Sequence, residues 1–267
     1  MCIRDSNNKF YVLSFQSPAD VFDKYVYLFE RAKSSFSFLQ PSQAKKTQEE
    51  TGQAVLNVSC GTVSDSLTVQ VERPEGLAWD GSNLWVSKEE PKNVDWGLTF
   101  YKLSSTGSVL DSFWVTVSGG HPTDGSYFWI EYSNPEATYF FRVDPSTRNA
   151  TYIFNSSMLY LMGLAWDGSN LWVSDYFSTK KIYKLDQSGN VLDTIDERAE
   201  LLAWGNSYLW VYLDGTIKKI EPNTGAVVGS GAMNPNYGCR DLAWDGSYLL
   251  CLDSNSAVVH KIDVSNC

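Results

Sequence analysis

The sequence predicts an all-β protein, a five-bladed β-propeller of four-stranded blades, with a small α+β segment before it. The first observation is a repeat, whose best-preserved copy is GLAWDGSNLWVSD at residues 163–175. The second is the period, because the first strands of successive copies lie between 38 and 44 residues apart. Periods near 40 residues with several short strands per unit are typical of propellers. The third is an Asp-Gly pair inside four of the five copies, which favours a tight β-hairpin.

Each copy predicts the first two strands of one blade. The copies occupy residues 76–88, 123–132, 163–175, 202–213 and 241–253, and the blades are expected to start near residues 76, 120, 163, 201 and 241. Strand a reads LAW, strand b LWVSD, strand c IYKLD and strand d GNVLDTI in the best-preserved blade. Large apolar residues alternate with small or polar ones along these strands, as expected for sheets stacked face to face.

A count of the strands predicts how the ring closes. Strands a, b and c occur five times, but strand d follows only the first four blades. The segment GTVSDSL at residues 61–67 matches strand d and stands before the first blade. We therefore expect an N-terminal closing strand within residues 61–71 to complete the last blade and to remove the open sheet edge. The alternative is a ring of six to eight blades truncated at both ends.

The residues before the propeller form three predicted segments. Residues 1–6, MCIRDS, look like translated sequencing-adapter read-through from a metagenome-derived reading frame, so we expect the native chain and its signal sequence to begin upstream. Residues 7–40 read as a truncated α+β remnant, with a strand at 10–15, a helix that starts after Ser17, and a strand at 34–39. Residues 41–58 are polar and predict a linker, and the propeller takes residues 59–267.

Charge limits the classes of partner. The net charge is −10, and residues 59–267 alone carry −11. Nucleic acids and anionic membrane surfaces require basic patches, so neither is expected as a partner. No apolar run approaches the roughly 18 residues needed to span a bilayer. The expected partner is a protein, a peptide or a glycan, and no cofactor is expected.

Two family resemblances follow from these motifs. The pattern GLAWDG-x-x-LWVSD, followed by IYKLD and G-x-V-L, resembles the Vgb/NHL/YVTN-like β-propeller group over residues 60–267. That resemblance implies a secreted or surface protein, and the group includes a lyase, a cyclotransferase-like branch and many non-enzymatic binding modules. The segments KFYVLSF, SPADVFDKYVYLFE and KSSFSF resemble the C-terminal end of PsbP-like domains over residues 9–39.

The polar residues of the repeat are interpreted as structural. Asp80, Asp124, Asp167 and Asp245 precede glycine in the a–b turn, where aspartate is favoured for backbone reasons. They lie one blade apart, too far from one another to share a metal ion, and no metal site is expected. The basic position on strand c, filled by Lys102, Arg142, Lys184, Lys219 and Lys261, is expected to be solvated or paired with a neighbouring blade.

The repeated tryptophans are expected in the core, and the exceptions predict a binding face. Trp96 breaks the pattern and lies in the longest b–c insertion, at residues 88–96. The b–c and d–a connections of a propeller open on one face, where ligands usually dock. The predicted ligand-binding face contains Trp96, His121, Tyr132, Asp175, Tyr176, Tyr237 and Asp253.

These residues favour a non-enzymatic extracytoplasmic binding or scaffolding module. His121 and His260 are the only histidines, and no residues show catalytic spacing. The rival is a lyase or cyclotransferase-like enzyme that uses the central cavity, with His121 near Glu131 or Asp175 as acid and base. A spacer without a specific ligand is the third possibility.

The cysteines test whether the N-terminal strand closes the propeller ring. If residues 61–67 form the missing strand d, Cys267 falls in the c–d turn next to Cys60, and we expect a disulfide between them. Such a bond requires an oxidising compartment. The alternative is two unrelated thiols at a frayed end. Cys251 is expected to be an inert core thiol, and Cys239 has no predicted partner.

Overall fold

The computed structural model describes residues 2–4, 10–12, 37–38, 60–92, 95–117, 127–158, 161–233 and 238–267. The chain divides into two compact units, residues 1–56 and 57–267. In the first unit, β1 (Cys2–Arg4), β2 (Phe10–Val12) and β3 (Ser37–Phe38) form an antiparallel sheet in the order β2–β1–β3. β2 and β3 lie within the two predicted strands. The predicted helix and linker lie outside the described residues.

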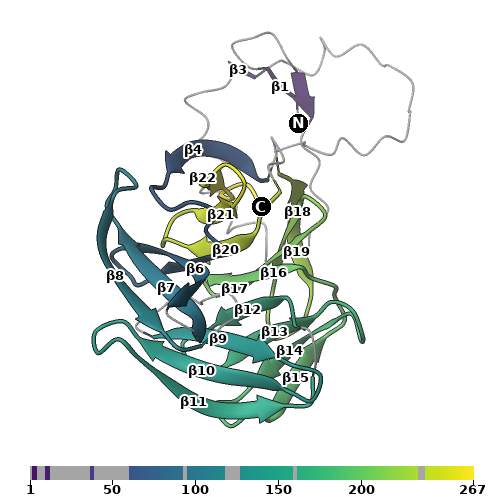
Figure 1. Ribbon diagram of the computed structural model, residues 1–267. Coiled ribbons are helices and arrows are strands. Elements are labelled where there is room, and N and C mark those ends of the chain that lie inside the picture. The colour runs from purple at the N-terminus through teal and green to yellow at the C-terminus, as the bar shows by residue number, and fades with distance from the viewer. Residues whose placement is uncertain are drawn as a thin grey trace. The chain divides into compact units, whose positions relative to one another are not determined.

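The second unit is a five-bladed β-propeller (Figure 1). Blade 1 contains β5 (Gly76–Trp79), β6 (Leu84–Lys92), β7 (Asp95–Leu103) and β8 (Val109–Val115). Blade 2 contains β9 (Phe128–Ser133), β10 (Thr138–Asp144) and β11 (Asn149–Ser156), and its predicted strand a lies outside the described residues. Blade 3 contains β12 (Gly163–Trp166), β13 (Leu171–Asp175), β14 (Lys181–Leu185) and β15 (Val191–Ile195). Blade 4 contains β16 (Leu201–Gly205), β17 (Tyr208–Leu213), β18 (Thr216–Ile220) and β19 (Val227–Ala232). Blade 5 contains β20 (Asp241–Trp244), β21 (Leu249–Asp253), β22 (Val258–Asp263) and β4 (Thr62–Thr68).

The a–b hairpins turn at an aspartate whose side chain binds the turn backbone. In blade 1, Oδ1 of Asp80 accepts hydrogen bonds from the backbone N–H groups of Ser82 (2.8 Å) and Asn83 (2.7 Å). The intervening Gly81 has a φ of +93°, a conformation that glycine adopts at low cost. Blades 3 and 5 repeat both features at Asp167 and Asp245.

The hydrophobic core consists of five clusters, and each cluster lies between two neighbouring blades. Between blades 1 and 2, for example, the rings of Phe100 and Phe128 stack with centroids 5.3 Å apart. The cluster between blades 5 and 1 contains the buried side chains of Leu77, Val86 and Leu252. Because this cluster joins the last blade to the first, five blades close the ring, and a truncated larger ring is not observed.

β4 completes the last blade, so the predicted closure is confirmed. In Figure 1, β4 lies beside β22, and the two strands pair antiparallel from Thr62, opposite Asp263, to Thr68, opposite Val258. A β-bulge falls between Lys261 and Ile262. Blades 1, 3 and 4 have their bulge at the corresponding step from lysine to leucine or isoleucine. The N-terminal strand therefore takes the register of an ordinary strand d.

The innermost strands of blades 5 and 1 are joined by a buried carboxylate. Asp241 takes the place that glycine has at the start of β5 and β12, and it is 3% exposed. Its Oδ2 accepts a hydrogen bond from the backbone N–H of Leu77 on β5 (2.7 Å). A hydrogen bond to a buried charged acceptor contributes about 1.5–3 kcal/mol, so this contact reinforces the closure.

His260 makes the closure sensitive to acid. Its imidazole is nearly buried on β22, and its Nδ1 lies 2.7 Å from the hydroxyl oxygen of Ser66 on β4. Burial lowers the pKa of His260, and the charge of Asp253 offsets this only in part. The unfolded chain therefore binds the proton more readily than the folded chain. We expect the free energy of unfolding to fall as the pH decreases below about 6.5, the value of an unperturbed histidine.

Urea unfolding at about pH 7 and pH 5 measures this effect, which cannot exceed about 1.4 kcal/mol per pH unit for one site. The His260→Gln variant should lose this part of the pH dependence. His121→Gln, at the other histidine of the chain, is the matched control and should keep it. An unchanged pH dependence in His260→Gln would contradict the assignment.

The predicted disulfide between Cys60 and Cys267 is present, with Cα atoms 4.9 Å apart. Two glycines of β19 leave room for it. A Cβ atom on Gly231 would overlap Cys60, and one on Gly229 would overlap the backbone of Cys267. The bridge therefore lies against the outer strand of blade 4 and links the residue before β4 to the end of the chain.

The prediction that Cys251 is an inert core thiol was wrong, because Cys251 forms a second disulfide with Cys239, for which no partner was predicted, with Cα atoms 5.3 Å apart. Cys251 does lie in the core on β21, fully buried. It belongs to the cluster between blades 4 and 5, which also contains Tyr212 and Met233. Cys239 packs against the same cluster, and its N–H donates to the hydroxyl of Tyr212 (3.4 Å). The repeat period carries no information about the irregular segment that contains Cys239.

The predicted long b–c loop of blade 1 is also corrected. β6 and β7 continue as paired strands as far as Lys92 and Asp95, so most of residues 88–96 belong to a hairpin. The hydroxyl groups of Thr99 (2.5 Å) and Tyr101 (3.0 Å) both donate to Oε1 of Glu90 on the opposite strand. These polar cross-strand contacts extend the hairpin beyond the apolar part of the blade.

Candidate functional site

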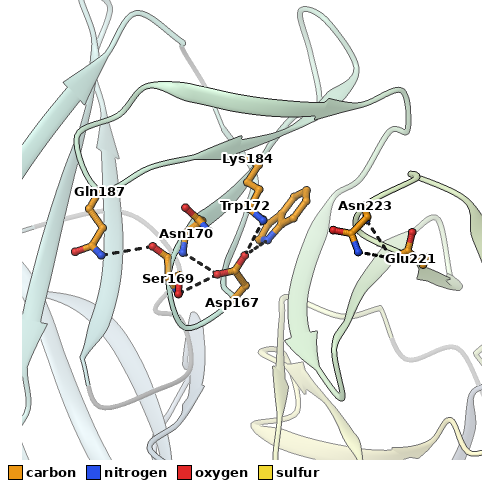
Figure 2. A network of polar contacts seen from close by, with 8 residues as sticks. All are labelled: Asp167, Ser169, Asn170, Trp172, Lys184, Gln187, Glu221 and Asn223. Atoms are coloured by element: carbon orange, nitrogen blue, oxygen red, sulfur yellow. Dashed lines mark hydrogen bonds and ion pairs between the residues drawn. The ribbon is translucent and has the colours of Figure 1, made fainter.

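The tryptophans of strand b form the fixed layer beneath the candidate site. Trp85, Trp129, Trp172 and Trp210 are at most 4% exposed. In blade 3, the indole N–H of Trp172 donates to Oδ2 of Asp167 (3.1 Å), and Nζ of Lys184 lies 3.3 Å from the same oxygen. Figure 2 shows this network, with Ser169 and Asn170 bound to the other side of the carboxylate. The turn aspartate therefore orients the indole as well as the hairpin.

Hydrogen bonding lowers the pKa of two turn carboxylates, Asp80 and Asp167. Burial raises the pKa of Asp80, but hydrogen bonds from the Trp85 indole and from the turn backbone lower it more, so the pKa lies below its ordinary value. The pKa of Asp167 is lowered in the same way, with a further contribution from Lys184. The structural interpretation of Asp80, Asp167 and Asp245 is confirmed, and Asp124 lies outside the described residues. Among the described residues, no three His, Cys, Asp or Glu side chains could together hold a metal ion.

In the described part of the propeller, the basic residues of strand c form no ion pair with a neighbouring blade, which was one of the two expected arrangements, solvation being the other. Each cation lies over an aromatic ring of its own blade, between 4.3 and 5.8 Å from the ring centroid. The pairs are Lys102 with Trp85, Arg142 with Tyr127, Lys184 with Trp172, Lys219 with Tyr208 and Trp210, and Lys261 with Tyr248. Such a contact is worth about 0.5–1 kcal/mol at a partly exposed site.

The tryptophans of strand a stack on this fixed layer across the blade boundary. Trp166 of blade 3 lies on Trp129 of blade 2, with ring centroids 5.3 Å apart. Trp204 of blade 4 lies on Trp172 of blade 3 (6.3 Å), and Trp244 of blade 5 lies on Trp210 of blade 4 (5.8 Å). The last two pairs are nearly parallel, with interplanar angles of 10° and 9°. Every strand-a tryptophan is only half-buried, so part of each indole remains accessible.

These half-buried rings surround a funnel of about 700 Å³. It opens at the end of the ring that carries the a–b and c–d turns. All five blades contribute to it, with Trp79, Tyr127, Trp129, Trp166, Trp204 and Trp244 as the aromatic wall and Asp80, Arg142, Asp167 and Gln187 as the polar side chains. A concave site with apolar walls and a few polar groups is the usual form of a small-molecule pocket. The tryptophan funnel is the candidate functional site.

The residues of the predicted ligand-binding face lie elsewhere, and none of those described lines the funnel. Trp96 is 60% exposed and Tyr132 is 39% exposed. Tyr176 is half-buried beneath the guanidinium of Arg198, whose Cζ lies 3.7 Å from the ring centroid. His121 and Tyr237 lie outside the described residues.

Two carboxylates of that face are engaged in the b–c turns. Asp175 is 4% exposed and accepts hydrogen bonds from the backbone N–H groups of Ser178 (2.8 Å) and Thr179 (3.0 Å). Asp253 accepts the backbone N–H of Asn255 (2.9 Å) and the hydroxyl of Ser256 (2.6 Å). Both aspartates therefore have a structural task at the ends of β13 and β21.

The sequence predicts that most of the repeated tryptophans lie in the core, and it does not predict the funnel. Strands a and b both carry tryptophan at a regular period, so the period alone does not separate a buried indole from an accessible one. The available signal is position. These tryptophans stand at or next to the last residue of strand a, beside the a–b turn. The described strands a contact one another from blade 3 through blade 5 to blade 1, so they are the innermost strands, and the funnel opens at their ends.

No family model and no curated protein matches the chain. The resemblances to the Vgb/NHL/YVTN-like group and to PsbP-like domains therefore stay predictions. Among solved structures, a chain of the Mitotic Checkpoint Complex is 12% identical with a TM-score of 0.45, over 85% of this chain and 98% of that chain. Hydrazine synthase of Kuenenia stuttgartiensis is 15% identical with a TM-score of 0.44, over 75% of this chain and 59% of that chain. Similarity at this level carries no information about function.

Proposed function

We propose that this chain is a non-catalytic binding module of an extracytoplasmic compartment, and that its tryptophan funnel binds a carbohydrate. The observation that carries the proposal is the set of aromatic faces that all five blades contribute to one opening. Sugar rings present C–H groups on their flat faces, and the negative face of an aromatic ring attracts such groups. Four half-buried indoles and the ring of Tyr127 converge on this opening and offer more of this surface than isolated exposed residues do.

The polar side chains of the funnel suit hydroxyl groups. The guanidinium of Arg142 donates hydrogen bonds, and the amide of Gln187 both donates and accepts them. The carboxylates of Asp80 and Asp167 already accept hydrogen bonds from the turns and from the strand-b indoles, so they hold the wall in place. The guanidinium and the amide stand among the indoles, so a sugar can stack and form hydrogen bonds at the same time. A few polar groups in an otherwise apolar pocket fix the orientation of the ligand and give specificity.

The charges of the funnel disfavour other ligands. A quaternary ammonium ion also binds aromatic cages. Here the guanidinium of Arg142 already lies over the ring of Tyr127, 4.6 Å from its centroid, in the place that such a cation would take. A net charge of −11 over residues 59–267 opposes a nucleic acid. A neutral ligand with stacking faces and hydroxyl groups fits best.

The two disulfides support the choice of compartment. Structural disulfides persist in oxidising compartments and are rare in the cytosol of most organisms. Asn149 and Asn155 of the sequons N-A-T and N-S-S are exposed on β11, as glycosylation of a secreted protein would require. Within the part of the chain that the structure describes, no helix has the length and apolarity needed to cross a bilayer.

Binding of the full chain to an array of neutral and acidic oligosaccharides tests the proposal. Trp166→Leu keeps an apolar side chain but removes one aromatic wall, so we expect it to weaken glycan binding at least tenfold. Trp96→Leu is the matched control, because this exposed tryptophan belongs to the other face, and it should leave binding unchanged. Loss of binding in Trp96→Leu alone would place the ligand on the b–c face. No binding of any oligosaccharide by the wild type would contradict the carbohydrate proposal.

A further inference from the structure

The series of strand-b tryptophans is interrupted once, in blade 5. In blades 1, 3 and 4 the alanine of strand a faces Trp85, Trp172 and Trp210, respectively, on strand b. In blade 5 the corresponding Ala243 faces Leu250. The boundary between blades 5 and 1 therefore lacks the indole on which a strand-a tryptophan stacks elsewhere. The strand-a tryptophan of this boundary is Trp79.

The groups that hold an indole in other blades are still present here. In blades 1 and 3, Oδ1 of the turn aspartate binds the turn backbone, and Oδ2 accepts the indole N–H at 2.7 and 3.1 Å. In blade 5, Oδ1 of Asp245 binds the backbone N–H groups of Ser247 (2.9 Å) and Tyr248 (2.7 Å). Within residues 60–267 as far as they are described, no hydrogen bond reaches its Oδ2. Lys261 occupies the position from which Lys184 covers Trp172.

A second cavity, of about 520 Å³, lies at this boundary. We call it the seam slot. Trp79, Asp245 and Lys261 line it in the positions that Trp204, Asp167 and Lys184 take around Trp172 in blade 3, and Leu250 stands in place of the indole. Its outer part extends to Leu67 on the closing strand and to Leu110 on β8. The slot thus contains an aromatic ring, a hydrogen-bond acceptor and a cation, and its outer part contains two apolar side chains.

We propose that the seam slot binds the indole ring of a tryptophan presented by a peptide segment of a partner protein. The ring would stack on Trp79 and lie beneath Lys261, and its N–H would donate to Oδ2 of Asp245. These are the three contacts that Trp172 makes with Trp204, Lys184 and Asp167 in blade 3. The seam slot shares only Trp79 with the tryptophan funnel, so it is a separate site from the proposed carbohydrate site.

A peptide is preferred over a free indole because of the outer part of the slot. The cavity continues past the space beside Trp79 to Leu110, which is 60% exposed, and to Asp65 and Ser66 on β4. A free indole would leave this part empty. The residues on either side of a bound tryptophan would lie there, against the apolar side chains of Leu67 and Leu110 and the polar side chains of Asp65 and Ser66.

The test uses the full chain, with isothermal titration calorimetry because the ten tryptophans of the chain obscure a fluorescence signal. The probes are the peptide acetyl-Gly-Leu-Trp-Leu-Gly-amide, its phenylalanine counterpart and N-acetyltryptophanamide. We expect the tryptophan peptide to bind at least fivefold more tightly than the other two. The phenylalanine peptide lacks the N–H donor, and the amide lacks the flanking residues. Equal binding of the phenylalanine peptide, or no binding at all, would overturn the proposal, and equal binding of the amide would overturn the choice of a peptide.

Leu250→Trp supplies the missing indole from within the chain. We expect it to fill the seam slot and to reduce peptide binding at least tenfold, while oligosaccharide binding in the funnel is unchanged. Lys261→Ala is the second variant, in case the larger side chain prevents folding. It leaves the core intact and should weaken peptide binding about threefold to tenfold. Unchanged peptide binding in both variants would overturn the proposal.

Discussion

Replacement of Cys60 and Cys267 by serine is expected to lower the free energy of unfolding by about 3–5 kcal/mol. The bond links residues 207 positions apart, so it encloses almost the whole propeller. In the chain-entropy model, a loop of this length restricts the unfolded chain by about 5 kcal/mol, and measured gains are often smaller. The closing strand β4 enters the ring directly after Cys60. Without the bond, β4 is held to blade 5 by one strand pairing and its side-chain contacts.

Urea unfolding of the oxidised wild type and the double variant measures this loss, and hydrogen exchange locates it. The amides of β4 and β22 should lose the most protection, because they form the closing pair. Cys239→Ser with Cys251→Ser is the matched control. Its bond closes a separation of only 12 residues, for which the same model gives about 3 kcal/mol. If the control variant loses as much free energy of unfolding as the Cys60, Cys267 variant, or more, the first bond does not stabilise the protein by closing the ring.

The repeat period was sufficient to predict the blades, because each strand is short and its pairing partner lies a few residues away. The closure required a comparison between distant segments, and the match of residues 61–67 to strand d provided it. The same comparison also aligned Cys60 with Cys267. Cys239 has no counterpart in other blades, so no alignment could find its partner. Contacts of this kind depend on the path of an irregular segment, which local pattern does not determine.

The candidate site was less predictable than the fold. Trp79 and Trp85 give the same signal in the sequence, yet one lines the tryptophan funnel and the other is core. The difference arises from the distance of each strand from the ring axis, which appears only after assembly. Asp175 and Asp253 were placed correctly at the ends of strand b, but short-range turn contacts use their carboxylates. The sequence shows that Leu250 takes a position where the other blades have tryptophan. Only the structure shows that a cavity, the seam slot, lies beside it.

Trp172→Leu is expected to lower the free energy of unfolding by about 2–3 kcal/mol, somewhat less than the usual cost of truncating a buried tryptophan to alanine. Trp172 is fully buried and stacks on Trp204, with ring centroids 6.3 Å apart. Leucine would lose this stacking and the indole hydrogen bond to Asp167. It would also uncover the cation of Lys184, which now lies 5.0 Å from the ring centroid. Urea unfolding gives the loss, and Trp96→Leu at an exposed site should change stability by no more than about 0.5 kcal/mol.

The same substitution gives blade 3 the arrangement found in blade 5, with leucine on strand b, aspartate in the turn, lysine on strand c and tryptophan on the next blade. If these four groups define the seam slot, Trp172→Leu should acquire a second site for the tryptophan peptide, between blades 3 and 4. Calorimetry would then give a stoichiometry near two instead of one. The peptide should also restore part of the lost stability, because it binds only the folded chain.

A Trp172→Leu variant that loses less than about 1 kcal/mol would show that the stacked indoles contribute little to the blade boundary. One that loses the expected stability but gains no site would show that the outer part of the seam slot, at Leu67 and Leu110, is required as well.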